Sequence, residues 1–233
     1  MSIDPRRSGV TLWALWVASS ALGQGLATLL AFSWLGAMVN GSDNPAALPY
    51  DLRLRAYFGT VTAIAALFQA LLLTLVAPAK RTALLWLLAS AIGAGLFFLL
   101  LQDGVENFSL SSTFTSLPRD TASAILDESI VVTYALGLGL AQGAALALIT
   151  ARKMAPAVWI AASLVALPLS MYVAGIAIEP QGTATSFVAS NALSHGAGAA
   201  VTGLALVLIF RLGRRDRIRA PGLAARSPLA PTP

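Results

Sequence analysis

The chain has 233 residues, of which 57% are apolar and 11% are charged, and its mean hydropathy is +0.77. A soluble domain carries about 25% charged residues, so this composition excludes an ordinary water-soluble enzyme, a nucleic-acid-binding domain and a disordered chain. The net charge of +5 would indicate a nucleic-acid partner only if the basic residues clustered on a folded face, and the absence of cysteine excludes disulfides and thiolate metal sites.

Six apolar stretches predict an all-α integral membrane protein, since a helix needs about 20 apolar residues to cross about 30 Å of hydrocarbon. None of the six has Asp, Glu, Lys or Arg in its interior. The first is 29 residues long and lacks a small-residue cleavage site, so we interpret it as a retained helix rather than a signal peptide. In chain order the predicted spans are 10–38, 57–76, 83–101, 130–150, 157–178 and 187–210.

The basic residues predict the orientation of these spans. Twelve of the 15 Lys and Arg residues fall on one side if the N-terminus is inside, and eight of the ten acidic residues fall on the other. The positive-inside rule therefore predicts cytoplasmic N- and C-termini. Residues 1–210 then form one transmembrane domain, and 211–233 form a tail that is basic and then rich in Pro and Ala.

Two sequence elements recur along the chain and predict an internal repeat. A Trp-x-x-small-Ser element starts at Trp16, Trp86 and Trp159. A Gln-x-x-x-Leu element starts at Gln69 and Gln142, each 17 residues before a Trp, and a weaker copy starts at Thr202. Repeats that enter the membrane in the same direction are related by an axis along its normal. We therefore expect three helical hairpins, about 10–76, 83–150 and 157–210, with pseudo-threefold symmetry.

These hairpins, a Trp-x-x-small-Ser-x-x-Gly helix followed by a Gln-x-x-x-Leu helix that ends in Lys or Arg, resemble a loose group of uncharacterised bacterial multi-span membrane proteins. The resemblance covers nearly all of the membrane part. It implies the repeated-hairpin architecture, a place in the inner (cytoplasmic) membrane of a bacterium, and no particular activity.

Three glutamines are the first candidate site. Gln24, Gln69 and Gln142 lie near the middle of predicted spans. An amide without partners in hydrocarbon costs several kcal/mol, so each should face the bundle or a wet cavity. They either join helices, at about 0.6 kcal/mol per contact, or line a midplane polar site.

The only histidine is the second candidate. His195 shares a helix face with Asn191, because the two are four residues apart. Both could contact a ligand or chromophore, such as haem, a chlorin or a metal; the other interpretation is a structural His bonded to a neighbouring helix. No cluster with metal-ligand spacing accompanies it, so we predict no metal site and name no cofactor.

His195 and the glycines after it also resemble the last catalytic helix of rhomboid proteases, in which His is the base. That resemblance implies Gly-x-Ser-Gly in the fourth span, where this chain has Gly139-Leu-Ala-Gln142-Gly143. A base without a nucleophile performs no acyl transfer. Only a rhomboid-like pseudoprotease would remain.

Two further expectations concern the membrane boundaries. The three repeated tryptophans lie one turn inside the cytoplasmic boundary, where an interfacial aromatic belt is expected. In the outer loop 103–128, Ser116 before Pro118 is expected to cap a short helix leading into the fourth span. The apolar residues Phe108, Leu110, Phe114 and Leu117 are expected to lie flat on the outer end of the bundle or against a partner.

Paired carboxylates, phosphate loops and nucleophile–base pairs are all missing from the spans. The sequence therefore favours a non-catalytic protein: a structural or accessory subunit of a membrane complex, or a lipid- or pigment-binding bundle. The alternative is a small-solute permease or channel with a site at the glutamines. The expected partners are the lipid bilayer and other membrane subunits, and no nucleic acid.

Overall fold

The computed structural model describes residues 9–39, 50–77, 81–100, 118–177 and 184–219 of the chain. Within these ranges all regular structure is α-helical, in six helices, and no strand occurs. The helices are α1 (Gly9–Val39), α2 (Tyr50–Val76), α3 (Thr82–Leu100), α6 (Arg119–Thr150), α7 (Ala155–Ala177) and α8 (Ala184–Arg219).

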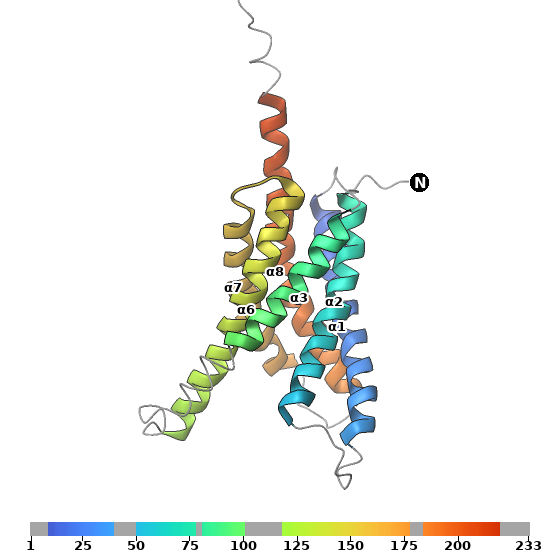
Figure 1. Cartoon of the computed structure of the whole chain (residues 1–233), viewed down its shortest axis with the longest axis vertical. Coiled ribbons are helices and arrows are strands. Elements are labelled where there is room, and N and C mark those ends of the chain that lie inside the picture. The colour runs from blue at the N-terminus through green and yellow to red at the C-terminus, as the bar shows by residue number, and fades with distance from the viewer. Residues whose placement is uncertain (1–8, 40–49, 78–80, 101–117, 178–183, 220–233) are drawn as a thin grey trace, which may run out of the picture.

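The six helices form a closed ring. Each packs against its neighbours along the chain, and α8 packs against α1 to complete the circle. Successive helices run in opposite directions, so α1 begins and α8 ends at the same end of the bundle, which we call the terminal end (Figure 1). This ring leaves one central space that all six helices surround.

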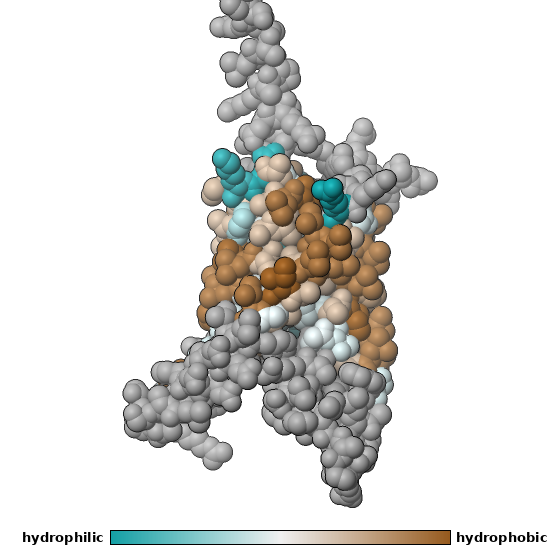
Figure 2. Space-filling view, viewed as in Figure 1, coloured by the Kyte–Doolittle hydropathy of each residue, from teal (hydrophilic) through white to brown (hydrophobic). Residues whose placement is uncertain are grey.

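The outside of the bundle is apolar, as a lipid-facing surface requires. A brown apolar band crosses the described part of the face seen in Figure 2. Large apolar side chains such as Leu22, Leu75 and Leu148 are exposed on the surface of the bundle. Five helices are long and apolar enough to cross a membrane, and the apolar part found in α3, Thr82–Phe97, is shorter than the usual span. The chain is a multi-pass helical membrane protein.

Several helices are longer than the apolar stretches that predicted them. The helix α2 begins at Tyr50 and α6 begins at Arg119, while α8 continues through Arg211 to Arg219. These extensions carry charged residues, which a search for apolar runs leaves out although they continue the same helix.

The expected helix leading into the fourth span is present as the first turns of α6, which begins at Arg119. The N-cap position of α6 is Pro118, which makes no side-chain cap bond, and Ala122 N donates directly to Pro118 O over 2.9 Å. Ser116 and the four apolar residues of the outer loop lie outside the described residues.

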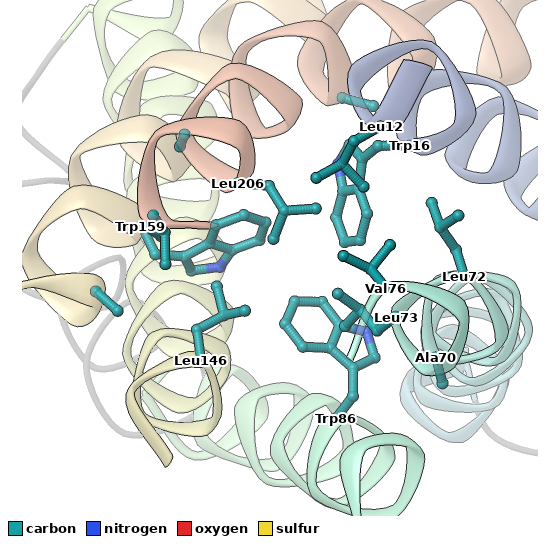
Figure 3. Close-up of a cluster of buried hydrophobic side chains, with 14 of the residues drawn as sticks. Leu12, Trp16, Ala70, Leu72, Leu73, Val76, Trp86, Leu146, Trp159 and Leu206 are labelled. Atoms are coloured by element: carbon teal, nitrogen blue, oxygen red, sulfur yellow. The ribbon is translucent and has the colours of Figure 1, made fainter. Parts of the chain in front are cut away.

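The three repeated tryptophans occupy the centre of the bundle, so the interfacial belt expected for them was wrong. Trp16, Trp86 and Trp159 are at most 2% exposed, and their rings pack edge to face with centroids 5.6 to 5.7 Å apart (Figure 3). Each edge-to-face contact adds about 0.5–1.5 kcal/mol beyond its buried area. Fully buried Leu73, Leu146 and Leu206 lie around them, and we call these six residues the tryptophan plug.

Candidate functional site

Gln69 ties three helices together beside the tryptophan plug. Its Nε2 donates to Ser20 Oγ on α1 over 3.1 Å, and its Oε1 accepts from Trp86 Nε1 on α3 over 3.2 Å. The amide thus satisfies a buried indole N–H, which would otherwise be a costly orphan in an apolar core.

Gln142 repeats this arrangement on the next three helices. Its Nε2 donates to Ser90 Oγ over 3.0 Å, and its Oε1 accepts from Trp159 Nε1 over 3.3 Å. Both predicted glutamines therefore point into the bundle, and both link a serine on the preceding helix with a tryptophan on the following one.

The third tryptophan has a different partner. Trp16 Nε1 donates to Thr202 Oγ1 over 3.0 Å. The Thr202 hydroxyl has only long contacts to acceptors of its own helix, 3.4 Å to Ala199 O and 3.5 Å to Gly198 O. Ser163, four residues after Trp159, donates to the Trp159 carbonyl over 2.9 Å, and the described residues show no bond between Ser163 and Thr202.

A cavity of about 130 Å³ adjoins the plug, on the side away from the terminal end. A cavity of about 150 Å³ is large enough to hold benzene, so this one has room for a molecule of slightly smaller size. Five helices line it, and the described residues of α3 do not. Its polar wall includes Ser20, Gln24, Gln69, Gln142, Ser163, Ser170, His195 and Thr202, and none of the described lining residues carries Asp, Glu, Lys or Arg.

Two polar side chains of this wall have no protein partner. Gln24 is 3% exposed and lines the cavity from α1, yet its amide makes no hydrogen bond with any described residue. The imidazole of His195, which lines the cavity from α8, likewise has no hydrogen-bond partner among the described residues. Thr62 and Tyr134 close another part of the wall with a 3.4 Å contact between their hydroxyls. Burying unpaired polar groups is unfavourable, so the cavity is suited to a molecule that bonds to them.

The structure brings together four of the five predicted site residues. Gln24, Gln69, Gln142 and His195 line one cavity, while Asn191 does not line it and donates instead to Phe187 O of its own helix over 2.9 Å. No group of three or more His, Asp or Glu that could hold a metal occurs among the described residues. Sequence reasoning missed Thr202 as the partner of Trp16, although the weaker third copy of the glutamine element marked its position.

A scan against protein-family models, a search of curated proteins and a search of solved structures each found no match to this chain.

Proposed function

We propose that this membrane protein is a non-catalytic bundle that binds a small, uncharged, hydrogen-bonding molecule in its central cavity. The observation that carries the proposal is that the Gln24 amide and the His195 imidazole, which have no hydrogen-bond partner among the described residues, line the same cavity. A ligand with donors and acceptors would satisfy both groups.

The lining supports a neutral ligand. A buried charge needs an opposite charge to offset its desolvation, and the described lining offers none. Ser163 and Ser170 donate to backbone carbonyls of their own helix rather than to a base, which supports binding without covalent chemistry. A cavity slightly smaller than one that holds benzene also does not fit haem or a chlorin, which leaves small polar molecules as the ligand class.

The architecture we propose is three repeated hairpins around a pseudo-threefold axis. Two matching Ser–Gln–Trp sets and a triangle of tryptophans support it. The three leucines of the tryptophan plug each follow Gln69, Gln142 or Thr202 by four residues, one per hairpin.

The tryptophan plug helps to distinguish a binding subunit from an open channel. It fills the bundle axis toward the terminal end, and this supports an accessory subunit or receptor of a bacterial inner membrane rather than an open channel. A small-solute permease is the alternative, and the polar cavity beside the plug supports it. Transport would require the plug to open, so solute flux into proteoliposomes would favour the permease.

Filling the cavity tests the proposed binding. Ala135 is 4% exposed and lines the cavity, whereas Ala144 lies on the exposed face of the same helix. We expect saturation-transfer NMR on the full chain in nanodiscs to detect acetamide and glycerol on the wild type and on Ala144→Leu, and neither on Ala135→Leu. Acetate and methylammonium should give no signal on any of them.

The proposal fails if both neutral probes bind Ala135→Leu as well as they bind Ala144→Leu, or if neither probe binds the wild type. Thermal unfolding of the two variants shows whether each remains folded, since a leucine in a tight core can destabilise it by about 1–3 kcal/mol. If Ala135→Leu unfolds, Ala135→Val repeats the test with a smaller side chain.

A further inference from the structure

The three tryptophans of the plug differ in what their indole N–H groups meet. Trp86 and Trp159 each donate to the oxygen of a primary amide, from Gln69 and Gln142. Trp16 donates to the hydroxyl of Thr202, whose side chain ends two bonds short of where a glutamine would place its amide nitrogen. The third position therefore has the tryptophan and the serine of the other two positions but no amide between them.

The cavity reaches this third position, because Trp16, Ser163 and Thr202 all line it. Each of the other two sets lines it only in part: Ser20 and Gln69 do so without Trp86, and Gln142 and Trp159 do so without Ser90. Gly198, one turn before Thr202 on α8, also lines it, and a Cβ there would lie 3.0 Å from Ala166 O, so the missing side chain lets α7 and α8 pack closely beside the cavity. A longer side chain at position 202 would extend from a residue that lines the cavity.

We infer that a small primary carboxamide from outside the chain binds here and takes the place of the missing glutamine amide. This inference rests on the proposed function and names its ligand class. The ligand carbonyl accepts from Thr202 Oγ1, which has only the long contacts of 3.4 and 3.5 Å to give up. The ligand amino group donates to Ser163 Oγ, as Gln69 Nε2 donates to Ser20 Oγ.

The chemistry of the site selects an amide over other neutral groups. A carboxamide offers an acceptor and two donors in one plane, which matches the hydroxyl pair of Thr202 and Ser163. A ketone has no donor for Ser163, and a carboxylate would bring a charge that no described lining residue balances. Acetamide is also smaller than benzene, so it fits a cavity of this size.

Comparing acetamide with acetone tests the inference, because acetone keeps the carbonyl and lacks the amino group. We expect wild-type protein in nanodiscs to bind acetamide about tenfold more tightly than acetone in saturation-transfer NMR titrations, the effect of one additional hydrogen bond in a buried site. Ser163→Ala should remove this preference. Ser170→Ala is the matched control, since Ser170 also lines the cavity and also donates to a backbone carbonyl, and it should keep the preference.

The variant Thr202→Gln supplies the missing amide within the chain. It should abolish acetamide binding and raise the thermal unfolding midpoint. Equal binding of acetamide and acetone to the wild type would overturn the inference, as would an unchanged preference in Ser163→Ala. If glycerol binding is still lost in Ala135→Leu while the amide preference is absent, the ligand class is wrong and the proposed binding function stands. If Thr202→Gln fails to fold, Ser163→Ala alone decides.

Discussion

Single hydrogen bonds at buried tryptophans hold neighbouring helices in register. Trp159 is 2% exposed, and removing Gln142 takes away the hydrogen-bond partner that its indole N–H has among the described residues. Ser90, the other partner of Gln142, can instead bond to a carbonyl of its own helix, as Ser163 and Ser170 do. The Gln142 side chain therefore stabilises the bundle mainly through its hydrogen bond with the Trp159 indole.

Replacing Gln142 by Leu should destabilise the bundle by about 1–2 kcal/mol, between the cost of a buried orphan donor and the smaller values measured for polar contacts in membranes. Trp159→Phe keeps an aromatic ring in the plug and removes the N–H. A double-mutant cycle of the two changes, measured by thermal unfolding, should give a coupling energy of at least about 0.5 kcal/mol. Additive effects would show that the contact contributes nothing.

At the scale of helices, α3 and α6 approach closely through glycine. A Cβ built on Gly93 would lie 2.8 Å from Leu138 Cα, and one built on Gly137 would lie 2.8 Å from Gly93 O. Both neighbours are backbone, which cannot rotate away. Small residues that let helix backbones meet are the usual basis of packing in lipid.

The variant Gly93→Ala should therefore force α3 away from α6 and lower stability by about 1–3 kcal/mol. The matched control is Gly95→Ala on the same helix, since a Cβ at Gly95 meets nothing within 4 Å. That change should be neutral or stabilising by up to about 1 kcal/mol, because alanine is the better helix former. Equal destabilisation by the two variants, in the same unfolding assay, would contradict the close-packing argument.

Hydropathy predicted the number and order of the helices because an uncharged run of about 20 residues has few alternatives to a spanning helix. It did not predict the first turns of α2 and α6, since residues such as Asp51 and Asp120 continue a helix without being apolar. Nor did it place the tryptophans, because an indole one turn from the boundary fits an interfacial belt and a packed core equally well. Only the ring closure of α8 on α1 decides between them.

At the scale of the whole molecule, the site depends on contacts between residues far apart in the chain. Gln24 and His195 meet at one cavity because α1 and α8 are neighbours, and a single sequence does not give that pairing. The periodic glutamines were the exception: their mid-span positions already required an inward orientation. Asn191 shows the limit of the same reasoning, since a helix face shared with His195 did not bring it to the cavity.

The orientation of the bundle in the membrane can be tested with single introduced cysteines, because the chain has no cysteine of its own. Twelve of 15 basic residues lie at the terminal end or in the segments joined to it, so that end should face the cytoplasm. Single cysteines at Ser42, Ser112 and Gly182, in segments outside the described residues, should react with an impermeant maleimide on intact cells. A cysteine at Ser227 should react only after the membrane is permeabilised. Labelling of the cysteine at Ser227 from outside would show that the bundle has the opposite orientation, with the tryptophan plug on the outer side of the cavity.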